Sequence, residues 1–199
     1  MKQNFTKDFL ELVNTAGTFE EYSFFENLKE RIIIFNQQVD DSLVERVIMQ
    51  ILKWNREDTG KPQEERKEIE ILINTPGGVV DIGLVLCEVI KKSETNVNGT
   101  VLGMAASMGS LLTMACKKRR AYKFSNVLIH DGSTMLHGTS NKVKDHFKFQ
   151  EKKDQQIKGF ILDNTKITSD KYDEMIDREW WLTAEDALEY GIIDEIIGE

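Results

Sequence analysis

Three kinds of residue in this chain could together perform nucleophilic catalysis: a serine, a histidine and an acid. Ser107 follows an apolar segment, a glycine and two alanines, and it precedes Met108-Gly109. The small neighbours allow a tight turn that leaves the hydroxyl accessible. Free N–H groups at the start of a following helix could stabilise an oxyanion. A lone Ser-x-Gly more often only caps a helix, so the serine needs support from other residues.

A general base and an orienting acid are both available. His130 closes the apolar run 127–129, and imidazole titrates near neutrality, although a histidine that closes a buried strand is commonly structural. A carboxylate could orient the imidazole and stabilise its charged form. Asp177 and Glu179 are candidates near the C-terminus, but with 34 acidic residues in the chain their presence alone is a weak signal.

A glycine pair offers the backbone groups that such a site needs. Asn74-Thr75-Pro76-Gly77-Gly78 follows a predicted strand, and glycines permit positive φ and close approach of a ligand to backbone N–H groups. The serine is not in the Gly-x-Ser-x-Gly turn of α/β-hydrolases, because Ala105 stands two residues before it. The site therefore has to be argued from several segments together.

Apolar runs that alternate with amphipathic segments position these residues. The pattern predicts an α/β fold in which helices pack on a mostly parallel sheet, with the turns at 77–78 and 103 at the carboxyl ends of strands, where open α/β sheets place their sites. We expect strands at 32–35, 69–73, 97–102, 122–124 and 127–129, and helices at 5–16, 43–52, 81–90, 105–116 and 141–165.

Two charged segments stand apart from this pattern. Residues 54–68 are rich in charge and carry Gly60 and Pro62, which predicts a solvated, mobile loop. The predicted helix at 141–165 has only a thin apolar stripe, so it is either a solvated arm or an element that packs on another subunit.

Composition limits the protein classes. The chain has 199 residues, 40% hydrophobic and 30% charged, with a net charge of −8. This favours one folded core and disfavours a nucleic-acid partner. Cys87 and Cys116 lie in apolar runs, which predicts reduced core thiols rather than a disulfide or a metal site. No secretory leader or membrane span is predicted, so we expect a soluble cytoplasmic protein without a metal or cofactor.

Five segments, in order, closely resemble the ClpP family, the proteolytic subunits of ATP-dependent Clp proteases. They are Leu28–Ile33, Ile73–Val79, Gly103–Ser110, Leu128–His130 and Leu182–Asp194. The resemblance implies a ClpP/crotonase-like fold with a peptidase domain at 22–199, preceded by an N-terminal extension at 1–21. A handle of one strand and the long helix would occupy about 131–165.

The resemblance also implies roles for individual residues. Ser107 would be the nucleophile and His130 its base. The N–H groups of Gly78 and Met108 would form the oxyanion hole, and Val79 and Val80 would hold an extended peptide by main-chain hydrogen bonds. An ungapped alignment places the catalytic acid on Glu179, where the family has aspartate, and Asp177 is the alternative.

The implied activity is that of a serine endopeptidase that cleaves unfolded polypeptides inside a chamber of stacked heptameric rings fed by an AAA+ unfoldase. Two alternatives remain open. The glutamate at 179 and an altered handle motivate a catalytically impaired ring subunit. In the handle, Asp131-Gly132 stands where the family has Gln-Pro, and Thr134-Met135 stands where it has a glycine pair. A crotonase-like acyl-CoA enzyme would share the broad fold and the backbone oxyanion hole.

Overall fold

The computed structural model describes residues 17–198. Within this range, seven strands form one sheet in the order β1-β2-β3-β4-β7, and β5 pairs with both β3 and β6. All pairings are parallel except β5 with β6. The strands are β1 (Ile32–Phe35), β2 (Ile69–Thr75), β3 (Val97–Ala106), β4 (Arg119–Tyr122), β5 (Asn126–Ile129), β6 (Trp180–Thr183) and β7 (Glu195–Ile197). The predicted α/β class is confirmed.

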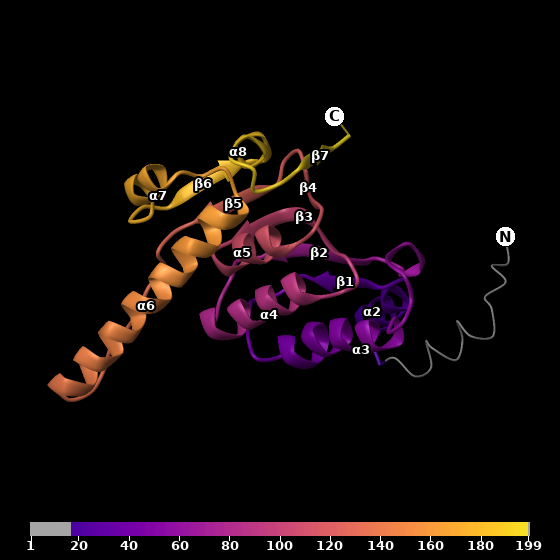
Figure 1. Cartoon of the computed structure of the whole chain (residues 1–199), viewed down its shortest axis with the longest axis horizontal. Helices are drawn as coiled ribbons and strands as arrows, with labels where there is room; N and C mark the ends of the chain where they lie inside the picture. Colours follow the sequence, from indigo (N-terminus) through magenta and orange to yellow (C-terminus); the bar gives the residue numbers. More distant parts are fainter. Residues whose placement is uncertain (1–16, 199) are drawn as a thin grey trace, which may run out of the picture.

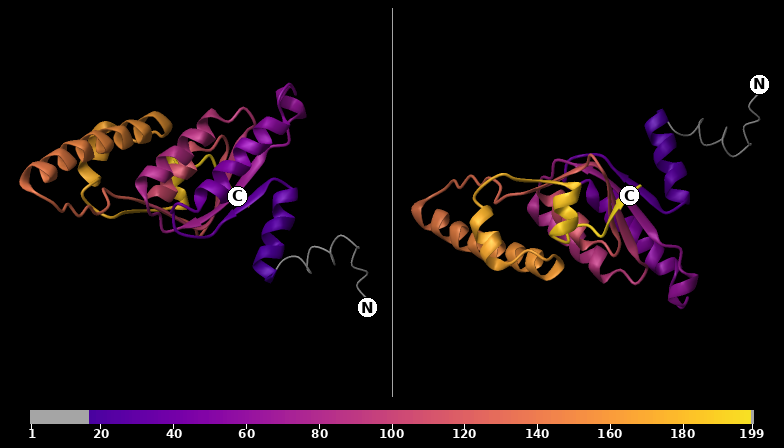
Figure 2. Two further views of the ribbon diagram at one scale, coloured as in Figure 1. Left: turned by 90° about the horizontal axis from the view of Figure 1, so that it is seen from below. Right: turned by 90° about the horizontal axis from the view of Figure 1, so that it is seen from above.

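Helices cover the sheet and extend from it (Figures 1 and 2). The α-helices are α2 (Phe19–Lys29), α3 (Met49–Glu57), α4 (Val80–Lys92), α5 (Met108–Ala115), α6 (Ser140–Asn164), α7 (Ser169–Met175) and α8 (Ala184–Glu189). A π-helix, η1 (Val44–Ile48), leads into α3, and a short 3₁₀ turn, η2 (Gln63–Glu65), precedes β2. In both views of Figure 2, α3 and α4 lie on one side of the sheet and α2 on the other.

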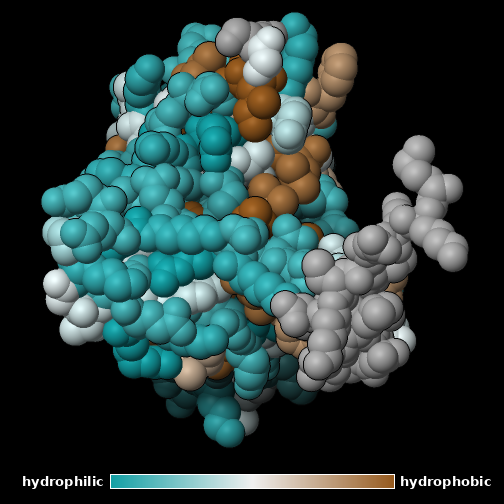
Figure 3. All heavy atoms as spheres, turned by 90° about the vertical axis from the view of Figure 1, so that its right-hand side faces the viewer, coloured by the Kyte–Doolittle hydropathy of each residue, from teal (hydrophilic) through white to brown (hydrophobic). Residues whose placement is uncertain are grey.

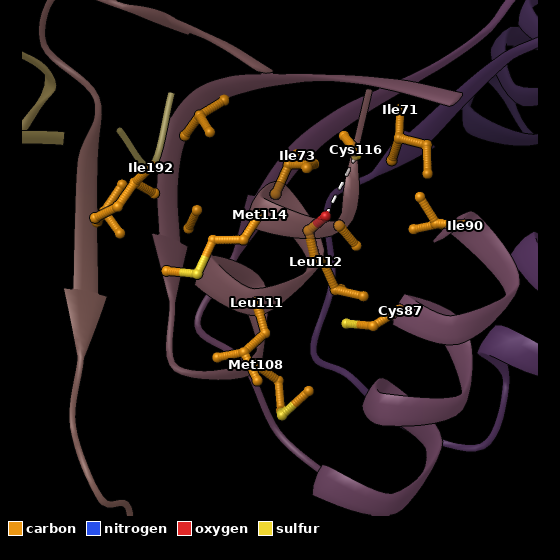
Figure 4. Close-up of a cluster of buried hydrophobic side chains, with 14 of the residues drawn as sticks. Ile71, Ile73, Cys87, Ile90, Met108, Leu111, Leu112, Met114, Cys116 and Ile192 are labelled. Atoms are coloured by element: carbon orange, nitrogen blue, oxygen red, sulfur yellow. Dashed lines mark hydrogen bonds between the residues drawn. The ribbon is translucent and has the colours of Figure 1, made fainter. Parts of the chain in front are cut away.

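The core lies between the sheet and the helices that cover it. Alternate residues of β2 face this core, with Ile69, Ile71 and Ile73 buried and the residues between them only half-buried, as the two-residue period of a strand requires. Figure 4 shows Ile71 and Ile73 packed against side chains of α4 and α5. Cys87 and Cys116 are buried free thiols in the same cluster, so the prediction of reduced core cysteines is confirmed.

The prediction of a solvated loop at 54–68 holds for residues 59–68, which form neither α-helix nor strand and are almost all exposed, and was wrong for residues 54–58. Helix α3 continues to Glu57, and Asp58 is fully buried. Its carboxylate accepts hydrogen bonds from the Arg31 guanidinium, from Thr95 Oγ1 at 2.9 Å and from Lys61 Nζ at 2.8 Å. A buried carboxylate needs such partners, and these come from distant parts of the chain, which local charge patterning does not show.

The N-terminal part of the described structure differs from the prediction. Helix α2, which we did not predict, begins at a capping box formed by Thr18 and Glu21 and contacts β1. The helix predicted at 5–16 lies outside the described residues. None of the helices in the described part of the chain is long and apolar enough to cross a membrane.

The long helix projects from the body of the molecule (Figure 1). Helix α6 has 25 residues, of which only Ile161 is buried. Residues 130–137, before it, have neither helix nor strand, so of the two expected parts of the handle this structure forms the helix. Figure 3 shows a face of the body on which hydrophilic side chains predominate and a streak of hydrophobic ones runs through the upper half.

Candidate active site

Ser107 occupies a sharp turn between β3 and α5. Its backbone has φ 53° and ψ −120°, a strained region for a residue with a side chain. The turn is held on both sides. The Ser107 N–H donates to the Leu128 carbonyl at 2.9 Å, and the Ser107 carbonyl accepts from the Ser110 N–H at 3.0 Å and the Ser110 hydroxyl at 2.7 Å. Within residues 17–198 the Ser107 hydroxyl makes no hydrogen bond, so it is available for chemistry.

The predicted helix at 105–116 therefore begins three residues later than expected. Ala105 and Ala106 complete β3, and Ser107 is the residue before α5 rather than part of its first turn. This placement puts the hydroxyl at the carboxyl end of a central strand, on a turn comparable to the strained turns that present nucleophiles in hydrolases.

The glycine pair lies directly against this turn. A Cβ built on Gly77, which has φ 90°, would be 2.6 Å from the Ala106 carbonyl oxygen and 2.7 Å from Ser107 Cβ. Only glycine permits this approach. Gly78 pairs with Val39, because the Val39 N–H donates to the Gly77 carbonyl and the Val79 N–H donates to the Val39 carbonyl, each at 2.8 Å.

Two backbone N–H groups are left over by this arrangement. The N–H groups of Gly78 and Met108 have no acceptor in the described part of the chain. Gly77, the residue before Gly78, packs closely on Met108, because a Cβ built on Gly77 would be 3.0 Å from the Met108 nitrogen. Unpaired N–H groups beside a nucleophile are suited to bind a developing oxyanion.

Side chains from β2 hold the glycine turn in place. Thr75 is buried, and its hydroxyl accepts the Gly77 N–H at 3.1 Å. The Asn74 side chain accepts the Met104 N–H at 3.1 Å and donates to Asn36 Oδ1 at 2.7 Å. The turn after β2 is thereby fixed to β3, the strand that ends in the serine.

His130 follows the strand next to the one that ends in the serine. Strands β3 and β5 are parallel with Ala106 beside Leu128, so Ser107 and His130 both lie just beyond the carboxyl ends of neighbouring strands. The His130 side chain is half-buried, and its imidazole makes no hydrogen bond with any of the described residues. It borders a hollow of about 240 Å³ between α6 and α7.

The candidate acids lie on the segment before β6. In the antiparallel β5–β6 pair, Ile129 is beside Trp180, so one step further in the same register His130 stands opposite Glu179. In this structure the Glu179 carboxylate accepts the Trp181 indole N–H at 3.3 Å. The Asp177 side chain is 80% exposed and is 4.0 Å from the Arg178 guanidinium.

The two valines with an expected role in peptide binding lie at the start of α4. Both main-chain groups of Val79 are engaged within the chain, since its N–H donates to Val39 and its carbonyl accepts from Gly83 at 3.2 Å. Val80 is the first residue of α4. The exposed side chain of Val79 remains open to a ligand.

Sequence reasoning missed the residues around His130 that come from α6 and α7. Asp154 and Lys158 on α6, and Tyr172 and Asp173 on α7, border the same hollow as the histidine. Nothing in the local sequence of the polar helix α6 or of the short helix α7 indicates that these residues lie near a site. Only the packing of the two helices brings them to the end of β5.

The family model for Clp proteases matches residues 16–199. The chain belongs to the Clp protease family. It is 32% identical over 181 residues to an "ATP-dependent Clp protease proteolytic subunit" of Dehalococcoides mccartyi, and the match covers 90% of this chain and 86% of that relative. It is 31% identical over 186 residues to an "ATP-dependent Clp protease proteolytic subunit 2" of Rhodococcus jostii, with 92% of each chain covered.

Membership of this family makes the chain a peptidase, and the parallel sheet with its projecting helix agrees with that family's fold. It also favours the peptidase over the crotonase-like acyl-CoA alternative.

Proposed function

We propose that this chain is a serine endopeptidase, the proteolytic subunit of an ATP-dependent Clp protease that cleaves unfolded polypeptides. One observation carries the proposal: the strained Ser107 turn, with an unbonded hydroxyl and two unpaired N–H groups beside it. In this proposal Ser107 is the nucleophile, His130 the general base, and Glu179 the acid that orients His130.

The chemistry follows from these roles. Ser107 Oγ attacks the peptide carbonyl while His130 takes its proton. The carbonyl oxygen becomes an oxyanion that accepts the N–H groups of Gly78 and Met108. When the C–N bond breaks, His130 returns the proton to the leaving amine. Water, deprotonated by His130, then hydrolyses the ester on Ser107 and regenerates the hydroxyl.

The peptide would lie along the start of α4. We place Val79 and Val80 beside it, and because the main-chain groups of Val79 are already bonded, its contact with the peptide would be made by its side chain. The peptidase domain would extend over residues 22–199, with residues 1–21 as an N-terminal extension.

The assembly would be a homo-oligomer of stacked heptameric rings that receives substrate from an AAA+ unfoldase. Helix α6 supports this part of the proposal, because it is almost entirely unburied and exposes Phe147 and Phe149. Aromatic side chains exposed on a projecting helix are suited to contact a second copy of the chain.

A fluorophosphonate probe followed by mass spectrometry of the adduct tests the nucleophile. The proposal predicts a single adduct on Ser107, no labelling of Ser107→Ala, and retained labelling of Ser140→Ala, an exposed serine at the start of α6. Unchanged labelling of Ser107→Ala would sink the assignment.

A catalytically impaired ring subunit is the second candidate. The observation in its favour is that the Glu179 carboxylate bonds to Trp181, while the imidazole of His130 is unbonded within residues 17–198. Peptide hydrolysis by the purified chain alone would exclude this candidate, whereas activity only after mixing with a second subunit would establish it.

A further inference from the structure

A hollow of about 240 Å³ opens beside His130 and has a mixed lining. It is bounded by the end of β5 and by residues of α6 and α7. Figure 1 shows how these three elements are arranged. Its lining begins at His130 and Asp131, just after β5, and continues with residues of α6 and α7 that are named below.

The charges around the hollow do not balance. It has three carboxylates and one ammonium group, and Lys158 is committed to Asp173, whose two oxygens it contacts at 2.6 and 2.7 Å. Asp154 accepts a hydrogen bond from the neutral Gln150 amide at 2.8 Å. The Asp131 carboxylate has no hydrogen bond or ion pair with the described residues. Two negative charges are therefore left without a cation.

A tyrosine with an unpaired hydroxyl also borders the hollow. Tyr172 is only 6% exposed, its hydroxyl makes no hydrogen bond within residues 17–198, and that oxygen is not among the fully buried unpaired atoms of this range, so it reaches an open surface. Burial, reinforced by the carboxylates of Asp154, Asp173 and Asp131, raises the pKa of Tyr172 to about 12, so the phenol stays neutral at physiological pH. Because the ring is held in the core while the hydroxyl lacks a partner, a ligand in the hollow could reach a phenol oxygen in a fixed position.

The remaining walls are apolar. Ile157 and Ile176 are half-buried residues that pack against the core, and the Asp131 N–H donates to the Ile176 carbonyl at 3.0 Å, which fixes that wall. A lining that combines aliphatic side chains with carboxylates and an unpaired phenol matches a side chain that has a methylene stem and a cationic head.

We propose that this hollow receives the lysine or arginine side chain of the substrate residue whose carbonyl Ser107 attacks, so that the peptidase prefers to cleave after basic residues. The proposal rests on the proposed function. The side chain next to an attacked carbonyl must lie within a few ångströms of the nucleophile and its base, and this hollow borders that base. Asp131 and Asp154 would be the specificity-determining residues, with Tyr172 as an acceptor for the cationic head.

Peptidyl diphenyl phosphonates test the proposal, because they label a catalytic serine and carry a side chain only on the attacked side. Matched reagents with a lysine-like or a leucine side chain are compared by the rate of Ser107 labelling. We expect the lysine-like reagent to react about tenfold faster, the gain from pairing a cation with partly exposed carboxylates. Equal rates, or faster labelling by the leucine reagent, would overturn the proposal.

Variants assign the preference to the hollow. Asp154→Asn and Asp131→Asn should each slow the lysine-like reagent about fivefold and leave the leucine reagent unchanged, since each removes one charge from a partly exposed site. Tyr172→Phe should slow the lysine-like reagent alone. Asp170→Asn is the matched control, because Asp170 lies on α7 like Tyr172 but does not line the hollow. It should change neither rate. A preference that survives Asp154→Asn, Asp131→Asn and their combination would contradict the assignment.

The outcome separates this proposal from the proposed function. If both reagents label Ser107 at rates that show no preference for the basic side chain, the specificity proposal is wrong, and the proposed serine peptidase activity still holds. Failure of a simple fluorophosphonate to label Ser107 removes both.

Discussion

The two halves of the candidate site differ in how strongly the chain itself fixes them. The half around Ser107 is held by backbone hydrogen bonds from three strands and by the close approach of Gly77. The half around His130 lies at the end of β5, beside the exposed helix α6, and its imidazole has no bonded partner among the described residues. The proposed oxyanion site and nucleophile are thus built into one chain, whereas the proposed base and its acid depend on side chains near a surface that we propose as an interface between copies.

The largest effect should come from the acid of the histidine half. Glu179→Gln removes the charge that stabilises the imidazolium and favours the wrong tautomer, so we expect kcat for peptide cleavage to fall about a thousandfold or more. Asp177→Asn, two residues away and 80% exposed, is the control and should retain activity. The reverse result would make Asp177 the orienting acid.

The next effect tests the packing of the serine half. Gly77→Ala would push its Cβ into the Ala106 carbonyl and Ser107 Cβ, so we expect labelling of Ser107 to slow about a hundredfold as the nucleophile is displaced. Gly60→Ala is the matched control, because Gly60 also has positive φ, at 82°, but has open space around it. If both variants label equally fast, the close approach at Gly77 does not position the serine.

A smaller effect, on stability rather than on chemistry, is expected far from the site. Asp58→Asn removes the buried anionic partner of the Arg31 guanidinium and leaves only the half-exposed Glu57 carboxylate, 3.6 Å away, and breaking such a buried pair costs about 3 kcal/mol in the free energy of unfolding. Urea unfolding measures this, with Glu57→Gln, which removes the half-exposed partner of the same guanidinium, as the comparison. A loss below that of the control would show that the network does not stabilise the fold.

The same pair predicts a pH dependence. The hydrogen bonds from Arg31 hold the pKa of Asp58 well below its ordinary value of 3.8. The carboxylate therefore binds protons less readily in the folded state, and its contribution to stability is present above pH 3.8 and is lost as the pH falls further. Asp58→Asn should reduce the acid sensitivity of unfolding in that range, and an unchanged profile would exclude this linkage.

The smallest effect concerns the hydrogen bond that Glu179 makes in this structure. Trp181→Phe removes the indole N–H that the carboxylate accepts, and we expect a change of only a fewfold in kcat, because an exposed hydrogen bond to a charged group contributes about 1 kcal/mol. In a Glu179→Gln background the same substitution should have no further effect. An additive loss would mean that Trp181 acts independently of Glu179.

These contrasts also explain which features the sequence could predict. Strands β1, β2, β3 and β5 follow from apolar runs with the right period, and the turns at Gly77 and Ser107 follow from small residues at strand ends. Helix α2 was missed because it buries none of its residues, so it has no apolar stripe to detect. The backbone conformation of Ser107 and the burial of Asp58 depend on contacts between distant segments, which no local pattern contains.

A crystal structure of the phosphonate-labelled oligomer would test the account most directly. We predict that the phosphorus is bonded to Ser107 Oγ, that a phosphonyl oxygen accepts the N–H groups of Gly78 and Met108, and that the His130 imidazole lies within hydrogen-bond distance of both Ser107 and Glu179. An adduct on another residue, or an imidazole that remains out of reach of Ser107 in the assembled protein, would contradict it.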